Sequence, residues 1–246
     1  MGALYFFQEK LMFYPDKLER SYQYSFDESY EEMMIKTSDD KLINALLFKA
    51  KSTKGLIFYL HGNAGSLESW GTVAKIYTDL NYDVFISDYR GFGKSEGSIN
   101  SEKQLYEDNQ IAYNLMKESY NEENIIVLGY SIGTGMAAKL ASENNPKLLI
   151  MQAPFYSFKE MMSNQFYFPT FILKYKFRTN EYLEQCECPI VIFHGDRDEI
   201  VNYKWSLKLK EEFKDKIQLI TLHGEVHNGI TDNIDYRMEL ENVLMK

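Results

Sequence analysis

Three scarcities limit what this 246-residue chain can be, and cysteine is the first of them. Only Cys186 and Cys188 are present, with no histidine beside them. Two thiols make no disulfide framework and fall short of the four ligands that a structural zinc site needs. We therefore expect two buried structural thiols.

Basic residues are the second scarcity. The chain has 27 lysines and arginines against 36 aspartates and glutamates, which gives a net charge of −9. A nucleic-acid groove needs a strongly basic surface to offset the phosphate charge. We therefore expect no nucleic-acid partner, and small neutral substrates are favoured over polyanions.

Long apolar runs are the third scarcity, because no run reaches the roughly 18 residues of a membrane helix. We expect the chain itself to form a soluble domain. Residues 3–7 are nevertheless hydrophobic and directly precede the polar residues 8–10. They are either the end of a membrane anchor or a short apolar segment that docks on the domain, and the sequence leaves both open.

Short apolar segments, by contrast, are plentiful and regularly spaced, and 45% of the residues are hydrophobic. Runs typical of strands buried on both faces occupy residues 56–60, 84–87, 125–128, 148–151, 190–193 and 217–222. Helical patterns lie at residues 66–80, 102–120, 134–142, 203–213 and 233–245. Residues 33–36 and 42–48 predict an antiparallel hairpin. This alternation predicts one α/β domain over residues 1–246, with a mostly parallel sheet covered by helices on both faces.

Residues 155–184 are too long for an ordinary crossover and are rich in aromatic side chains. They form either one or two helices packed on the sheet edge, with the aromatics in the core, or a small cap insertion over a substrate pocket. We favour the cap, because aromatic surface can hold an apolar acyl group. The candidate pocket residues are Phe155, Tyr156, Phe166 and Phe168.

The sequence Gly-Tyr-Ser-Ile-Gly at residues 129–133 carries the clearest chemical signal. It lies between an apolar run and a helical pattern, which is the context of a nucleophile elbow. Glycines flank the serine in such an elbow because the turn is too tight for larger side chains. We expect Ser131 to be a nucleophile and the backbone N–H of Ile132 to face the oxygen of the substrate.

A serine nucleophile needs a base, and the chain has only four histidines. His61 and His194 each precede a glycine at the end of an apolar run, which suits a structural role in a loop. His227 lies between the last predicted strand and the last helix, where the base belongs in a chain ordered serine, acid, histidine. His227 is therefore favoured, with His223 as the alternative.

The acid is expected in the loop after the predicted strand at residues 190–193. That loop contains Asp196, Asp198 and Glu199. Asp198 is favoured because an apolar pair follows it and would direct the loop toward the core. The other two carboxylates are typical of solvated surface charges.

A second oxyanion donor is expected in the loop at residues 61–65, which reads His-Gly-Asn-Ala-Gly. Gly62 lets the backbone approach the substrate oxygen, and the N–H of Asn63 is the expected donor. Each such donor is worth about 3 kcal/mol of barrier. A plain glycine turn is the alternative. The charged residues at positions 88–95 are expected to hold loops together rather than to touch substrate.

Together these motifs resemble the α/β-hydrolase superfamily, and within it the Bem46-like group that includes the ABHD13- and ABHD17-type serine hydrolases. The resemblance extends over nearly the whole chain, through residues 8–15, 60–65, 88–97, 129–135, 194–201 and 227–228. It implies an eight-stranded α/β-hydrolase fold with Ser131 as nucleophile, Asp198 as acid and His227 as base. It also suggests membrane association through an N-terminal anchor. Some members of the group resemble depalmitoylases, whose cysteine-rich N-terminal segment this sequence lacks, and this weighs against that activity.

We therefore expect a serine hydrolase that cleaves carboxylic esters or thioesters through an acyl-enzyme, with no metal or organic cofactor required. A long-chain lipase or an acyl-protein thioesterase is the nearest alternative. Dehalogenase or epoxide hydrolase chemistry would need a carboxylate at the elbow, and Ser131 argues against both. A catalytically idle interaction protein on the same fold is the alternative from a different class.

Overall fold

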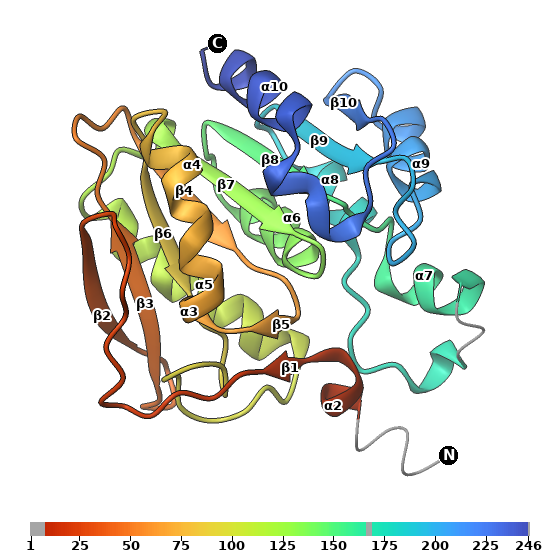
Figure 1. Ribbon diagram of the computed structural model, residues 1–246. Coiled ribbons are helices and arrows are strands. Elements are labelled where there is room, and N and C mark those ends of the chain that lie inside the picture. The colour runs from red at the N-terminus through yellow and green to blue at the C-terminus, as the bar shows by residue number, and fades with distance from the viewer. Residues whose placement is uncertain (1–7, 166–168, 246) are drawn as a thin grey trace.

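The computed structural model describes residues 8–165 and 169–245 (Figure 1). The hydrophobic segment 3–7 and the candidate pocket residues Phe166 and Phe168 lie outside these ranges. The strands are β1 (Tyr14–Pro15), β2 (Tyr30–Lys36), β3 (Leu42–Phe48), β4 (Leu56–Leu60), β5 (Ala64–Gly65), β6 (Asp83–Ser87), β7 (Ile125–Tyr130), β8 (Leu148–Gln152), β9 (Ile190–Gly195) and β10 (Ile217–Leu222). The helices are α2 (Gln8–Met12), α3 (Leu67–Trp70), α4 (Ala74–Thr78), α5 (Glu102–Lys117), α6 (Gly133–Glu143), α7 (Phe158–Gln165), α8 (Thr179–Gln185), α9 (Lys204–Glu212) and α10 (Ile234–Leu244), with 3-10 turns η1 (Gly71–Val73), η2 (Glu122–Asn124), η3 (Thr170–Ile172) and η4 (His227–Asp232).

The central sheet has eight strands in the order β10-β9-β8-β7-β4-β6-β3-β2. Neighbouring strands from β6 to β10 pair in parallel, and β3 runs antiparallel to both β6 and β2. Strands β4, β6, β7 and β8 are buried along their whole length, which explains their unbroken apolar sequences. The predicted α/β-hydrolase fold, with its mostly parallel eight-stranded sheet and opening hairpin, is confirmed.

Helices cover both faces of this sheet, so that two hydrophobic cores form (Figure 1). On one face α3, α4 and α10 pack through side chains such as Leu67, Tyr77 and Tyr236. On the other face α5, α6, α8 and α9 supply the apolar packing, with Tyr113 and Trp205 among the buried side chains. The loops that follow the parallel strands emerge together at one edge, where sites of α/β proteins usually lie.

The helical pattern expected at residues 66–80 is present and is divided into α3, η1 and α4. The division falls at Gly71, where an added Cβ would lie 2.3 Å from the ring of Phe26. Within residues 155–184, Phe155 and Phe177 are buried in the core, and α7 and η3 lie between them in the chain.

The two cysteines are free and buried, as expected. Burial raises the pKa of the Cys186 thiol to about 12 and that of Cys188 to about 11. Both thiols are therefore protonated near neutral pH and act as small apolar side chains. Within residues 8–165 and 169–245, no helix combines the length and apolar character needed to cross a membrane.

Candidate active site

Ser131 lies at the turn between β7 and α6, in a backbone conformation that few residues adopt. Its φ is +52°, in the left-handed region, as a nucleophile elbow requires. The two motif glycines make this turn possible. An added Cβ at Gly129 would lie 2.6 Å from the carbonyl oxygen of Gly133, and one at Gly133 would lie 2.1 Å from that of Leu60. The elbow therefore presses α6 directly against the end of β4.

The structure brings Ser131, His227 and Asp198 together from three separate loops. Ser131 Oγ lies 3.0 Å from His227 Nε2, and His227 Nδ1 lies 2.6 Å from Asp198 Oδ2. Asp198 follows β9 and His227 begins η4 after β10. Because these strands are parallel neighbours, their following loops meet beside the elbow. The arrangement has the geometry needed to remove a proton from the serine hydroxyl.

Asp198 is held as a carboxylate by a dense set of donors. Its Oδ1 accepts the backbone N–H groups of Ile200 at 2.8 Å and Val201 at 2.7 Å, while Oδ2 lies near two histidines. Burial alone would raise the pKa of this carboxyl group. The hydrogen bonds with His194 and His227 outweigh burial and hold the pKa of Asp198 well below its usual range. Asp198 is thus charged throughout the neutral range.

His194 is a site residue that the sequence did not reveal, since we expected only a structural role in a loop. It is fully buried, and its Nε2 lies 3.1 Å from Asp198 Oδ2 and 2.9 Å from the carbonyl of Val201. Both partners are acceptors, so Nε2 carries a proton and donates it. Nδ1 then accepts a hydrogen bond from the hydroxyl of Ser206 at 2.6 Å. His194 therefore orients the carboxylate of Asp198. Its position four residues before an acid at a strand end was the available signal.

Tyr130, which lies between Gly129 and Ser131, makes a second contact that the sequence did not reveal. Its hydroxyl donates a 2.5 Å hydrogen bond to the backbone carbonyl of His227, and the two rings are 5.6 Å apart. Through this hydrogen bond, Tyr130 of the elbow holds the loop that contains His227 in place.

The alternative base and acid lie away from this cluster. His223, 84% exposed at its side chain, pairs with Asp196 at 2.9 Å. Asp196 also accepts the N–H of Gly224 at 2.7 Å, so the pair closes the turn after β10. In the loop at residues 88–95, Arg90 pairs with Asp39 in the turn between β2 and β3 and with Asp108 on α5, so its charge ties this loop to its neighbours.

A cavity of about 620 Å³ opens beside Ser131, Ile132 and Asn63. Phe155 lines it, together with Phe158, Met161, Met162 and Leu173 from the following segment. Tyr156 does not line it. Its side chain points away from the cavity, where the hydroxyl donates a hydrogen bond to Glu212 and the Lys208 amine lies over the ring.

The expected oxyanion donors border this cavity. Ile132 precedes the first turn of α6, and Asn63 lies in the loop between β4 and β5. Among the described residues, neither backbone N–H donates a hydrogen bond to another group. Asn63 is anchored instead by its carbonyl, which accepts the N–H of Tyr14 at 2.8 Å, and by its side chain, which donates to Met12. The two amides are thus available to a ligand oxygen.

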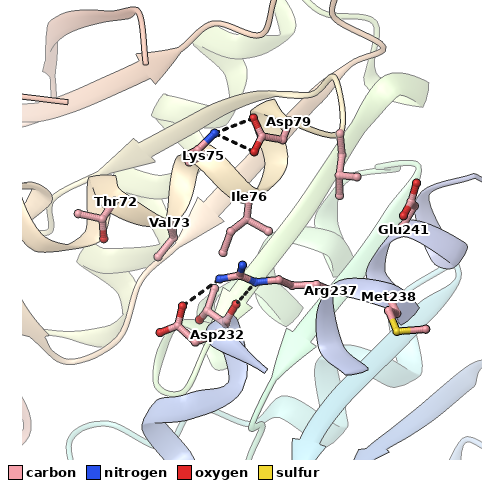
Figure 2. A pocket seen from close by; sticks show the side chains of 11 residues that line it. Thr72, Val73, Lys75, Ile76, Asp79, Asp232, Arg237, Met238 and Glu241 are labelled. Atoms are coloured by element: carbon pink, nitrogen blue, oxygen red, sulfur yellow. Dashed lines mark hydrogen bonds and ion pairs between the residues drawn. The ribbon is translucent and has the colours of Figure 1, made fainter. Parts of the chain in front are cut away.

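A second cavity of about 570 Å³ lies between α4 and α10 (Figure 2). Four of its ionic groups form ion pairs, Lys75 with Asp79 and Arg237 with Asp232. Neither a serine nor a histidine is among its lining residues in the described ranges. Of these two cavities, the one beside Ser131 is lined by both a serine and a histidine.

The family model described as Serine aminopeptidase, S33 (Hydrolase_4) matches residues 51–183. That range includes Asn63 and Ser131 and ends before Asp198 and His227. Protein bem46 of Schizosaccharomyces pombe is 30% identical over 221 residues, which cover 82% of this chain and 73% of that protein.

Two further comparisons concern a lipase and an esterase. Lysophosphatidylserine lipase ABHD12 of Mus musculus is 30% identical over 204 residues, which cover 71% of this chain and 51% of the relative, so the match spans about half of its length. The structure of an esterase from Pyrococcus furiosus has a TM-score of 0.73, at 18% identity, over 95% of this chain and 97% of that one. This last likeness shows the fold.

Proposed function

Because this chain belongs to the α/β-hydrolase family described as Serine aminopeptidase, S33, and is a hydrolase of the serine type, we propose that it cleaves small carboxylic esters or thioesters. In this proposal Ser131 is the nucleophile, His227 the base and Asp198 the acid, while the N–H groups of Ile132 and Asn63 bind the oxyanion. The observation that carries it is the continuous contact from Asp198 through His227 to Ser131, at 2.6 and 3.0 Å.

The reaction would proceed through a covalent acyl-enzyme. Ser131 Oγ attacks the carbonyl carbon while its proton moves to His227 Nε2, and Asp198 stabilises the imidazolium through Nδ1. The imidazolium then gives that proton to the leaving alcohol or thiol as its bond to the acyl carbon breaks. Water, giving a proton to His227, next attacks the acyl carbon. The carboxylic acid leaves and the Ser131 hydroxyl is restored.

The lining of the cavity favours a neutral ester over a peptide. None of the described lining residues is an aspartate, glutamate, lysine or arginine. An aminopeptidase must bind the ammonium group of its substrate, and an apolar wall would leave that charge unpaired at a cost of several kcal/mol. An acyl chain, by contrast, gains free energy from burial against these side chains.

Activity-based labelling tests the proposal. A fluorophosphonate probe should label the wild-type protein and not Ser131→Ala, and mass spectrometry should place the adduct on the peptide that contains residue 131. The same variant should lose at least about a thousandfold of its activity on p-nitrophenyl butyrate, with an unchanged circular dichroism spectrum. Absence of both labelling and ester hydrolysis in the folded wild type would instead support the catalytically idle interaction protein.

A long-chain lipase or acyl-protein thioesterase is the second candidate, and the mouth of the cavity favours it. Leu11, Tyr14 and Ile200 line the cavity, yet are 54%, 53% and 53% exposed. This apolar rim would extend the contact of a long acyl chain. We also propose that residues 155–184 act as a cap, because α7 contributes Met161 and Met162 to the wall. The length of the chain that the cavity accepts decides between the two candidates.

A further inference from the structure

His61 is a buried histidine that the proposed reaction leaves without a role. It directly follows β4, has no exposed surface and stacks against Trp70 at a ring distance of 5.6 Å. The Tyr89 ring lies 4.2 Å away on another side, and the Tyr89 hydroxyl donates to the His61 carbonyl at 2.7 Å. These contacts on several sides hold the His61 ring in one orientation.

The Nδ1 atom of His61 lies 2.7 Å from the carbonyl oxygen of Gly62. A carbonyl is only an acceptor, so Nδ1 carries the proton and donates it. The same peptide group that contributes this carbonyl also contains the N–H of Asn63. Because the peptide is planar and trans, its C=O and N–H point in opposite directions. Fixing the carbonyl toward the buried imidazole therefore fixes the Asn63 N–H away from it.

Asp88 lies at the other nitrogen of the ring. It directly follows β6, the strand beside β4, and its Oδ1 is 3.5 Å from His61 Nε2. Among the described residues, neither atom has a hydrogen-bond partner, so each of these two buried polar atoms has the other as its nearest ionic neighbour. The remaining oxygen, Oδ2, accepts the N–H of Leu67 at 3.2 Å. Oδ2 lies close to the backbone of Gly93, where an added Cβ would be only 2.0 Å from it, so a larger side chain at position 93 would displace the carboxyl group.

We propose that His61, held in place by Asp88, is a positioning residue that orients the Asn63 N–H toward the substrate oxyanion. This proposal rests on the proposed function, because it assigns a task within that reaction. It goes further by naming the group that sets the geometry of the oxyanion loop. The neighbouring contacts support it: Trp70 Nε1 donates to the Ala64 carbonyl at 2.7 Å, so both ends of the loop are tied to stacked rings.

The contact between His61 Nε2 and Asp88 Oδ1 needs one proton, carried by either atom, to be favourable. Nε2 without a proton would face a carboxylate with lone pairs on both atoms, which repel. Burial raises the pKa of Asp88, and the contact with His61 opposes this rise. Whichever atom carries that proton, Nδ1 keeps its own and continues to donate to Gly62. An asparagine at position 88 could serve the same end, with its amide N–H donating to Nε2 and its oxygen accepting from Leu67.

The experiment compares His61→Leu, His61→Asn, Asp88→Ala and Asp88→Asn by kcat and KM on p-nitrophenyl butyrate. Leucine has no donor, so kcat should fall roughly 10- to 100-fold while KM stays within about threefold. Asparagine at position 61 places an amide N–H near the position of Nδ1 and should recover part of this loss. Asp88→Ala should cost about tenfold in kcat, and Asp88→Asn about threefold.

A pair of inhibitors separates positioning from packing. An alkyl trifluoromethyl ketone forms an anionic adduct with the serine and uses the oxyanion donors, whereas the matching methyl ketone does so poorly. The inhibition constant of the first should rise in His61→Leu by about the same factor as kcat falls, and that of the second should stay nearly constant. Phe92→Leu is the packing control, because the Phe92 ring lies 5.5 Å from that of His61 and makes no hydrogen bond to it. It should lower Tm and leave kcat within about twofold.

The proposal is overturned if His61→Leu keeps kcat within twofold, or if its trifluoromethyl ketone affinity is unchanged. If that variant does not fold, the two Asp88 variants decide, and equal kcat values for alanine and asparagine would reject it. The Ser131→Ala variant distinguishes failure of this inference from failure of the proposed function. Full activity in Ser131→Ala removes the proposed function itself, whereas an inactive Ser131→Ala beside fully active His61 variants removes only this inference.

Discussion

Replacing Asp198 by asparagine should nearly abolish ester hydrolysis, whereas the same change at Asp196, in the same loop, should be tolerated. Oδ1 of Asp198 accepts two backbone N–H groups, from Ile200 and Val201. The side-chain oxygen of an asparagine must remain at that position, because an amide N–H there would oppose both donors. The NH₂ group then falls at the Oδ2 position and faces His227 Nδ1.

That placement forces the wrong tautomer on His227. An amide donor facing Nδ1 leaves Nδ1 as the acceptor, so the ring proton moves to Nε2, which faces Ser131 Oγ. Nε2 can then no longer accept the serine proton. The corresponding change in a serine protease triad costs about 10⁴ in kcat, or roughly 5.5 kcal/mol of barrier. We expect a loss of this order for Asp198→Asn, together with some loss of stability where the amide meets His194 Nε2–H.

The assay is kcat/KM on p-nitrophenyl butyrate near pH 8, with Tm and circular dichroism as controls for folding. Asp196→Asn removes charge from a carboxylate that pairs with the exposed His223, and it should stay within about threefold of wild type. Asp198→Asn retaining more than a tenth of wild-type activity would refute the assignment of the acid. So would a larger loss at position 196 than at position 198.

The remaining predictions concern acyl length, acid stability and fluorophosphonate labelling. Each added methylene should contribute up to about 0.8 kcal/mol, or about fourfold in kcat/KM, until the cavity is full. We therefore expect kcat/KM to rise from acetyl to roughly butyryl or hexanoyl esters and to fall by palmitoyl. A rise in kcat/KM that continues to sixteen carbons would favour the lipase. The pKa of Asp198 is lower in the folded state than the usual 3.9 or so, and its stabilising contribution is therefore present above about pH 4 and lost as pH falls toward the folded-state value. Unfolding by urea from pH 7 to pH 3 should show a steeper loss of stability for wild type than for Asp198→Asn, and parallel curves would contradict this linkage. Labelling by the fluorophosphonate should be slower in Asp198→Asn than in wild type by a factor similar to the loss in kcat, and equal labelling rates would place the defect after acylation.

Local patterns in the sequence were sufficient for most of the sheet. The strand at residues 56–60 and the hairpin strand at 42–48 were predicted with the bounds that the structure shows. For 56–60 the reason is that a parallel strand buried on both faces needs unbroken apolar side chains. The division of the helical segment at 66–80 was not predicted, and at Gly71 this segment packs closely against Phe26, a residue distant in the sequence. Tyr156 was not found in the cavity, because its partners Lys208 and Glu212 both lie on α9, far from it in the sequence.

The candidate site was predictable where the order of motifs along the chain carries the information. Ser131, Asp198 and His227 follow three strands of the sheet, and parallel strands bring their following loops to one edge. His194 was not predictable from spacing alone. Its contact with Asp198 depends on how the loop folds back so that Ile200 and Val201 point their N–H groups at the carboxylate. Asp88 and His61 likewise meet through tertiary structure, because each follows one of the two paired strands β6 and β4.

These two buried histidine–aspartate pairs make opposite demands on the same substitution, and this contrast tests the reasoning as a whole. At His227 the acid faces Nδ1, which must carry the proton so that Nε2 is free to accept from the serine. An amide at position 198 reverses that tautomer. At His61 the acid faces Nε2, while Nδ1 must carry the proton that is donated to Gly62. An amide at position 88 favours that same tautomer. Aspartate to asparagine should therefore be severe at position 198 and mild at position 88, although both carboxylates are buried beside an imidazole. Equal losses at the two positions would mean that charge, rather than the placement of a proton, governs both pairs.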